Sequence, residues 1–320
     1  MIACLPVPTP FAVGRVNCYL IEDDPLTLVD TGPNSGTSLT TLEQGLAEHG
    51  RRVEDLERIV LTHQHIDHIG LAGILAQRSG AEVCALDRLA PWLADYAASM
   101  DGDDAFSEAI MLRHGIPRDV TYALRAVSSS FRAWGASAQV THPLTDGGTL
   151  DFADRSFRVH HRPGHSPSDT VLHDEAEGTL LGGDHLLSQI SSNPLISRPL
   201  EGGEPADRPQ ALVVYLDSLR ATREMEISVV LGGHGEPVTG HRELIDERER
   251  MHVRRSRKIG RLIAERPRTA YAIAQAMWGN VAVTQAYLTL SEVLGHVDLL
   301  VNAGEVAEDE QDGVITLRPA

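Results

Sequence analysis

The sequence predicts an α/β fold in which strands and helices form layers. Short apolar runs alternate with segments of helical periodicity over the first 86 residues, a pattern typical of layered α/β folds. Hydrophobic residues make up 42% of the chain and charged residues 23%, which is ordinary for a globular protein. At 320 residues, the chain is long enough for one large domain with a small annex.

The first half of the chain supplies alternating elements. Two strands are predicted at residues 16–21 and 26–30, separated by the turn EDDP. A helix follows over 37–49 and ends at Gly50, and the strand RIVLT, residues 58–62, leads directly into a group of histidines. The apolar spacing in IGLAGILAQRSG predicts a helix that stops at Gly80, and AEVCAL then predicts another strand.

Residues 88–135 change character and are predicted to be mostly helical, an insertion that forms a lid or a pocket wall. Strands return in GTLDFADRSFRVHHR, DTVLHD, GTLLGGD and ISVVLGG, with a helix between the last two. A long helix is predicted at 241–265, and the order helix, helix, hairpin after Pro267 suggests a winged-helix-like annex. We therefore expect a catalytic domain over 1–240 and a connecting helix with the annex over 241–320.

Composition limits the classes of partner. The formal net charge of −17 repels phosphate backbones, and the aromatic content of 4% makes a base-stacking platform improbable, so nucleic acid is a disfavoured partner. No run of residues is long and apolar enough to span a membrane, and the N-terminus lacks the pattern of a secretory signal. The three cysteines are widely spaced and favour a reducing, cytoplasmic location.

The stretch VLTHQHIDHIG crowds His63, His65, Asp67 and His68 into six positions. A polar surface loop that happens to contain histidines is the simplest interpretation, and a metal site is the alternative. Two histidines that are two residues apart on an extended chain point to one side. The next aspartate and histidine fall where the chain turns into a helix, so they can face a second ion.

More donors follow other predicted strands. His165 lies in the turn RPGHSPSD, Asp184 follows GTLLGG, and His234 follows ISVVLGG, each beside glycine. A two-metal hydrolytic site needs donors from several such strand ends, with ions about 3.5–4 Å apart. Imidazole and carboxylate donors together suit zinc best, and also iron or manganese.

The motif HQHIDH, followed by His165, Asp184 and His234, resembles the HxHxDH, H, D and H pattern of the metallo-β-lactamase superfamily. LTLVDTGP, with Asp30, is similar to the strand-end Asp-Thr-Gly that precedes this pattern in the family. The resemblance covers roughly residues 10 to 260, and the tail resembles the annex of a bacterial hydrolase subgroup related to glyoxalase II. It implies a four-layer αββα sandwich with two divalent metal ions at one edge of the paired sheets.

The resemblance also implies roles for these residues. His63, His65 and His165 would hold the first metal, Asp67, His68 and His234 the second, and Asp184 would bridge them. Asp30 would orient the histidine cluster by hydrogen bonding, and water activated between the metals would attack the substrate. His185, beside the bridging aspartate, either donates a hydrogen bond to substrate or faces away from the site.

The implied activity is hydrolysis of a small acyl compound, a thioester or an ester. Common zinc β-lactamases have a cysteine where this chain has Asp184, which argues against antibiotic hydrolysis. The alternatives are a lactonase, a phosphodiesterase or endoribonuclease, an iron-dependent sulfur dioxygenase, and a winged-helix DNA-binding protein. The basic run at 248–268, with Arg254, Arg255 and Arg257, is the one feature that favours nucleic acid, and its simpler interpretation is a solvated helix face.

Three polar residues after the bridging aspartate, Ser188, Gln189 and Asn193, are candidate substrate contacts, whereas Tyr215 is expected to serve packing. The annex carries few basic residues and is expected to close the pocket or to form a homodimer contact.

Overall fold

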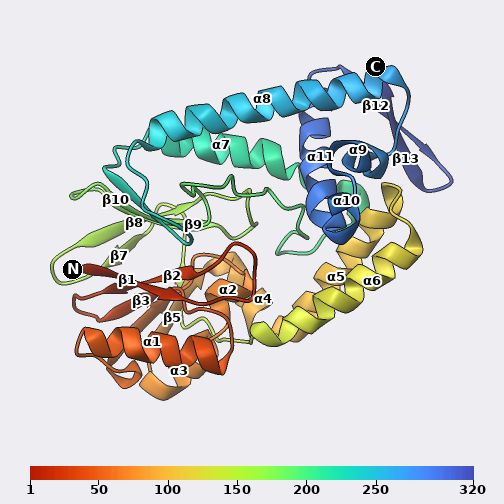
Figure 1. The fold of residues 1–320 in the computed structure, drawn as a ribbon. Coiled ribbons are helices and arrows are strands. Elements are labelled where there is room, and N and C mark those ends of the chain that lie inside the picture. The colour runs from red at the N-terminus through yellow and green to blue at the C-terminus, as the bar shows by residue number, and fades with distance from the viewer.

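The computed structural model describes residues 1–320 and shows two β-sheets packed face to face between helices (Figure 1). The first sheet has the strand order β1-β2-β3-β4-β5-β6, and its last four strands run parallel. Its strands are β1 Ile2–Val7, β2 Val16–Ile21, β3 Thr27–Val29, β4 Arg58–Val60, β5 Glu82–Leu86 and β6 His142–Leu144.

The second sheet has the order β11-β10-β9-β8-β7 and is antiparallel except for the pair β10 and β11. Its strands are β7 Thr149–Asp151, β8 Ser156–His161, β9 Thr170–Asp174, β10 Thr179–Gly183 and β11 Val229–Gly232. A cluster of buried side chains from both sheets, including Phe157 and Val60, fills the space between them. The sheets therefore form the two inner layers of the fold.

Helices form the two outer layers. Below the first sheet in Figure 1 lie α1 Gly36–Glu48 and α3 Ala72–Ser79, whose Leu42, Leu46 and Leu75 join the sheet in one hydrophobic cluster. Above the second sheet lie α7 Ala211–Arg223 and α8 His241–Glu265, whose Leu219 and Ile245 pack on Val171 and Leu180 of the sheet. The layer order is thus αββα.

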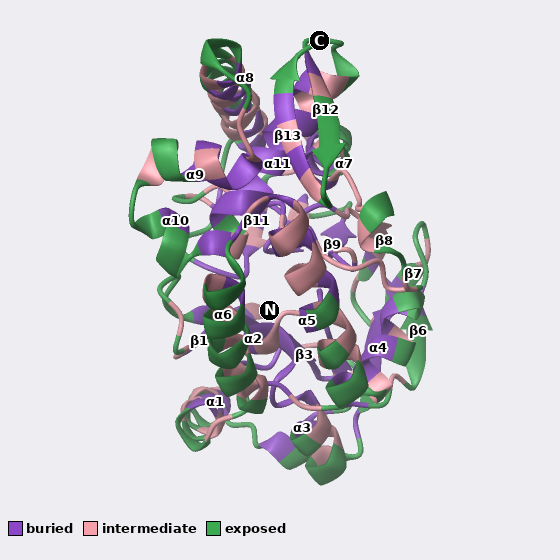
Figure 2. Ribbon diagram, turned by 90° about the vertical axis from the view of Figure 1, so that its right-hand side faces the viewer, coloured by how far each residue is buried: buried purple, intermediate pink, exposed green.

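The remaining helices lie at one end of the sandwich. The insertion forms α4 Ala90–Ala94, α5 Tyr96–Arg113 and α6 Arg118–Phe131, and the C-terminal segment forms α9 Ala270–Trp278, α10 Val281–Thr284, α11 Ala286–Asn302, β12 Val306–Gln311 and β13 Val314–Pro319. Phe106 and Ile110 of α5 share one hydrophobic cluster with α8, α9, α11, β12 and β13. The outward side of α6 is almost wholly exposed (Figure 2).

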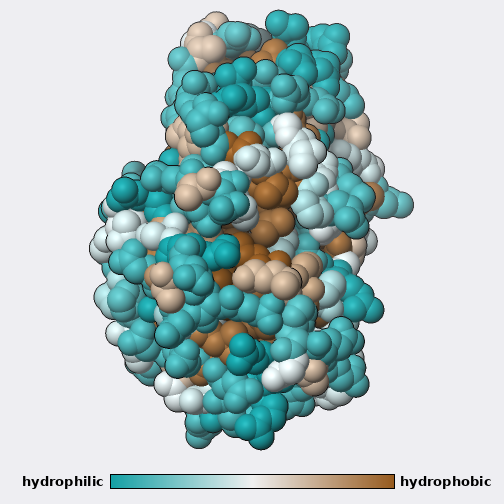
Figure 3. Space-filling model, turned by 90° about the vertical axis from the view of Figure 1, so that its left-hand side faces the viewer, coloured by the Kyte–Doolittle hydropathy of each residue, from teal (hydrophilic) through white to brown (hydrophobic).

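The predicted elements differ from the structure mainly in the shortest ones. The sequence patterns did not indicate β1, which contains Pro6, the three-residue β6, or the four-residue α10. β1 pairs along its whole length with β2 at the edge of the sheet, where a proline is tolerated. No helix of the structure combines the length and hydrophobicity needed to cross a bilayer. On the face in Figure 3, most of the strongly hydrophobic surface lies in a central strip, with smaller patches near the top and the edge.

Candidate metal centre

The seven predicted donors converge from both sheets on one edge of the sandwich. His63 and His65 follow β4, and the short helix α2, Ile66–Ile69, carries the next aspartate and histidine. The others lie in the β8–β9 turn, after β10 and after β11. The structure places these donors in overlapping groups that could each hold an ion: His63, His65 and His165; His63, His68 and Asp184; and Asp67, His68 and His234.

The first group consists of three imidazoles. His63 Nε2 and His165 Nε2 each lie 3.0 Å from His65 Nδ1. The rings of His65 and His165 meet edge to face at 86°, so their nitrogens, rather than their faces, approach one another. Three ring nitrogens that converge in this way match the imidazole donor set of a zinc site.

The carboxylate of Asp184 lies between this first group and the group of Asp67, His68 and His234, which we call the second group. Its Oδ2 is 3.7 Å from His165 Nε2 and 3.5 Å from His234 Nε2. Its Oδ1 is 3.5 Å from His68 Nε2. Asp67 Oδ2 completes the second group at 3.3 Å from His234 Nε2. One carboxylate therefore faces donors of both groups, which is the position that the sequence predicted for a bridging residue.

In four of the five histidines, Nδ1 faces a hydrogen-bond acceptor, and this directs Nε2 to the centre. For His63 the acceptor is the Thr62 hydroxyl oxygen, whose own proton goes to Asp30 Oδ2 at 2.8 Å. The acceptors are Thr62 Oγ1 for His63 at 3.0 Å, Asp30 Oδ2 for His68 at 2.7 Å, the Asn193 carbonyl for His165 at 3.1 Å, and the Arg15 carbonyl for His234 at 2.7 Å.

This arrangement leaves lone pairs that only a cation can satisfy together. A protonated His65 Nδ1 can donate to only one of its two neighbours, His63 Nε2 or His165 Nε2, and the lone pair of the other is then left without a donor. His68 Nε2 and Asp184 Oδ1 are buried without any hydrogen-bond partner. Buried polar atoms are rarely left unpaired, because desolvation is then uncompensated. The donor set therefore fits divalent metal ions.

The electrostatics favour a cation. Burial and the neighbouring imidazoles lower the pKa of His63 well below its usual range and that of His65 to about 3. Both rings are then neutral at pH 7, the form that binds metals. For His68, burial opposes the charged form, but the carboxylates of Asp184 and Asp30 outweigh it and raise the pKa well above its usual range. The second group therefore lies in an excess of negative charge.

Two backbone positions bring the donors close. Asp30 has a φ of 59°, a left-handed conformation that aspartate tolerates better than most residues, and both carboxylate oxygens accept bonds from Thr62. At Gly233, a Cβ atom would lie 2.4 Å from Asp184 Oδ1 and 2.7 Å from His68 Cε1. Only glycine lets the chain directly after β11 pass this close to the donors.

Residues 12–234 match the profile of a protein family described as the Metallo-beta-lactamase superfamily. The chain is also 35% identical over 294 residues to the probable metallo-hydrolase YqjP of Bacillus subtilis (strain 168), which covers 92% of this chain and 90% of that protein.

The chain belongs to the metallo-beta-lactamase superfamily.

Two further likenesses differ in extent. A beta-lactamase domain protein from Burkholderia ambifaria has a crystal structure with a TM-score of 0.84 at 29% identity, covering 100% of this chain and 92% of that one. A 70-residue stretch, 22% of this chain and 24% of the relative, is 41% identical to the exodeoxyribonuclease WalJ of Streptococcus pneumoniae. As a metallo-β-lactamase superfamily member related to a metallo-hydrolase over most of its length, the protein is a metallo-hydrolase.

The structure does not bring His185 to the donor groups of this superfamily member. Its Nε2 hydrogen-bonds Thr222 Oγ1 on α7 at 2.8 Å, and its ring packs edge to face on Tyr215. The reason is local, because successive side chains after a strand point to opposite sides, and Asp184 takes the side of the metal centre. Tyr215 is buried and donates to the His185 carbonyl at 2.8 Å, as expected of a packing residue.

The loop after Asp184 contributes a backbone carbonyl to the metal centre, which its polar side chains did not indicate. The side chain of Asn193 donates to the Leu288 carbonyl at 3.3 Å, and its own carbonyl holds His165. Ser188 Oγ is buried without a partner, and the side chain of Gln189 is exposed. Sequence analysis also missed the carbonyl of Arg15 and the hydroxyl of Thr62, because neither a carbonyl nor a lone threonine carries a sequence signal.

Proposed function

We propose that this protein is a two-metal hydrolase of a small acyl substrate, a thioester or an ester. The observation that carries the proposal is the carboxylate of Asp184, which lies 3.7 Å from His165 Nε2 and 3.5 Å from His234 Nε2. One residue can thus serve two ions at once. In this proposal His63, His65 and His165 hold the first ion and Asp67, His68 and His234 the second.

Divalent ions bound at these groups would supply water of lowered pKa and would polarise the substrate oxygen. We propose zinc, with iron or manganese as alternatives, because the donors are imidazole and carboxylate. The chain's own contribution is to orient the donors. Asp30 keeps the proton of His68 on Nδ1 through a 2.7 Å hydrogen bond, which leaves Nε2 free for the ion.

Four finer assignments belong to the same proposal. We assign the chain to the glyoxalase II-like subgroup, because its tail resembles the annex of a bacterial hydrolase subgroup related to glyoxalase II. We divide it into a catalytic domain over 1–240 and a connecting helix with a winged-helix-like domain over 241–320, where helices α9, α10 and α11 precede the β12–β13 hairpin. The three unpaired cysteines fit a reducing cytoplasm. A homodimer contact through the C-terminal segment is part of this proposal.

Elemental analysis, combined with a substrate panel, tests this function. We expect about two divalent ions per chain and turnover of an acyl thioester or ester, which a chelator abolishes and added zinc restores. A lactone as the preferred substrate would favour the lactonase alternative. One iron per chain with consumption of oxygen would instead indicate a dioxygenase, and protein that binds no metal would contradict the proposal.

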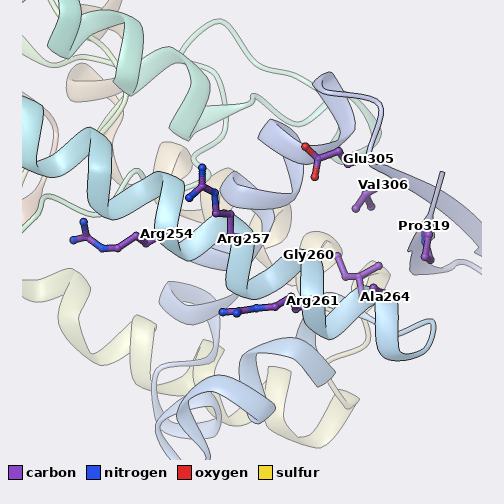
Figure 4. A pocket seen from close by; sticks show the side chains of 9 residues that line it. Arg254, Arg257, Gly260, Arg261, Ala264, Glu305, Val306 and Pro319 are labelled. Carbon is purple, nitrogen blue, oxygen red and sulfur yellow. The ribbon is translucent and has the colours of Figure 1, made fainter.

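A nuclease is the second candidate function, and the outer face of α8 favours it. Arg254, Arg257 and Arg261 are exposed, form no ion pair, and line a hollow of about 640 Å³ with Glu305 and Val306 (Figure 4). The matched stretch of the exodeoxyribonuclease WalJ points the same way. The three guanidinium groups follow one another along α8, with those of Arg254 and Arg261 extending to the same side, so they suit an extended polyanion better than a single phosphate.

The nuclease function predicts that an Arg254→Ser/Arg257→Ser double variant binds single-stranded oligonucleotides more weakly. The slope of log affinity against log salt should become shallower by about 1.4, which is about 0.7 for each lost contact to a single-strand phosphate. Arg255 is unsuitable for this test because it is paired with Glu292. Arg51→Ser/Arg118→Ser, which removes equal charge from exposed residues elsewhere, is the matched control. Equal salt slopes for the two variants would count against a nuclease.

A further inference from the structure

We propose that the C-terminal segment positions the three-histidine half of the metal centre through residues 186–196, which we name the linking segment. The inference rests on the proposed metal sites. It concerns positioning, since the C-terminal residues involved touch the linking segment and no metal donor. The linking segment begins two residues after Asp184 and ends against α11.

On the side of the metal centre, the linking segment holds two donors. The Asn193 carbonyl accepts the Nδ1 proton of His165 at 3.1 Å and so sets the orientation of this ring. The Ser192 hydroxyl donates to the Asp184 carbonyl. Because the acceptor on Nδ1 fixes which nitrogen of a histidine faces the ion, a shift of the Asn193 carbonyl would turn the His165 ring.

On the other side, α8 and α11 hold the linking segment by five hydrogen bonds. Every one of them comes from the C-terminal segment 241–320. They are Arg248 Nη2 to the Leu187 carbonyl at 3.4 Å and to the Ser188 carbonyl at 3.3 Å, Asn193 Nδ2 to the Leu288 carbonyl at 3.3 Å, the Ile196 amide to Ser291 Oγ at 3.3 Å, and the Tyr287 hydroxyl to the Ile196 carbonyl.

The linking segment depends on these bonds because it has little regular structure of its own. No helix or strand lies within it, so its backbone groups have few local partners. Its two ends are buried in different cores. Leu186 packs with the second sheet and α7, whereas Ile196 packs with α5, α9 and α11. The segment therefore spans from the catalytic sandwich to the C-terminal core, with Asn193 between the two anchors.

Ile196 is the point at which the C-terminal segment can be released from the linking segment most selectively. A Tyr287→Phe/Ser291→Ala double variant removes both side-chain bonds to its backbone and leaves every proposed donor unchanged. Tyr271→Phe is the matched control, because Tyr271 lies in the same hydrophobic cluster and its hydroxyl forms no hydrogen bond. A merely structural role for Tyr287 and Ser291 would lower thermal stability without acting on one metal site in particular.

The test is a zinc titration of metal-free protein against a chromophoric chelator. It is done in the full chain and in an Asp67→Ala background, which leaves the three-histidine group intact. We expect the double variant to weaken binding at the three-histidine group by about 10-fold, the lower end of what loss of an outer hydrogen-bond partner costs. The second site should change by less than about 2-fold, and Tyr271→Phe should change neither. Equal affinities in wild type and double variant would overturn the inference.

Hydrogen exchange on the unmodified protein provides a second test that does not depend on any variant folding. Coupling between sites is reciprocal, so zinc binding should slow amide exchange in the linking segment and at the start of α11. No change in exchange at these amides on zinc binding would also overturn the inference, while leaving the proposed function intact. Wild-type protein that binds no zinc, iron or manganese would instead defeat the proposed function and the inference together.

Discussion

Replacing Asp67 with alanine is expected to remove one metal ion per chain and nearly all turnover, while the fold is retained. The carboxylate lies in the second donor group, 3.3 Å from His234 Nε2, and is 7% exposed, so water cannot readily take its place. Loss of a partner outside the donor set costs about 10–100-fold in metal affinity. Loss of a charged donor should therefore cost more than about 100-fold.

The measurement is metal content by elemental analysis together with kcat/KM on the acyl substrate found in the panel. Asp174→Ala is the matched control. Asp174 is also a buried carboxylate of the sandwich, but it accepts the Ala176 and Glu177 amides at the β9–β10 turn and contacts no donor. The control should lose stability and keep two ions. An Asp67→Ala protein with two ions and wild-type kcat/KM would refute the assignment.

Gly70→Ala is expected to be the most destabilising of the conservative substitutions around the site. Gly70 ends α2 with an ordinary helical φ of −56°, so the backbone conformation suits alanine. The space around Gly70 does not accommodate alanine, because a Cβ would lie 2.3 Å from the Asn34 amide nitrogen and 2.4 Å from the Trp134 carbonyl oxygen. These two atoms are hydrogen-bonded to each other at 2.6 Å. We expect a loss of about 3 kcal/mol in the free energy of unfolding.

Urea unfolding measures this loss, with Gly36→Ala as the control. Gly36 is the first residue of α1, and a Cβ there would meet nothing within 4 Å. Alanine at this position should raise the free energy of unfolding by about 0.4–1 kcal/mol, because it restricts the unfolded chain. If both glycine variants unfolded at the same urea concentration, the close packing of α2 against residues 34 and 134 would be contradicted.

The sequence was sufficient to place the donors because each follows a strand or begins a helix. The apolar runs before His63, Asp184 and His234 marked strand ends, and strand ends of packed sheets meet at a common edge. The same pattern could not place His185, since the direction of a side chain after a strand depends on one residue of register. The structure decides this direction through the bond to Thr222.

The contacts that orient the donors could not be predicted. His165 and His234 are held by the carbonyls of Asn193 and Arg15, and a carbonyl is present at every residue of any chain. Which carbonyl arrives at a given ring depends on how loops distant in sequence pack. For the same reason, periodicity predicted that residues 88–135 were helical, yet it gave no sign that α5 shares a core with the C-terminal helices.

This shared core makes two segments that lie far apart in the sequence depend on each other. Phe106, Ile110 and Met111 of α5 pack in the cluster formed with Leu290 and Val293 of α11. A chain that lacked the last helices would expose these apolar side chains to water, so the insertion and the C-terminal segment depend on each other for burial. Transferring only one of the two segments to another protein of this superfamily would leave its apolar side chains exposed to water.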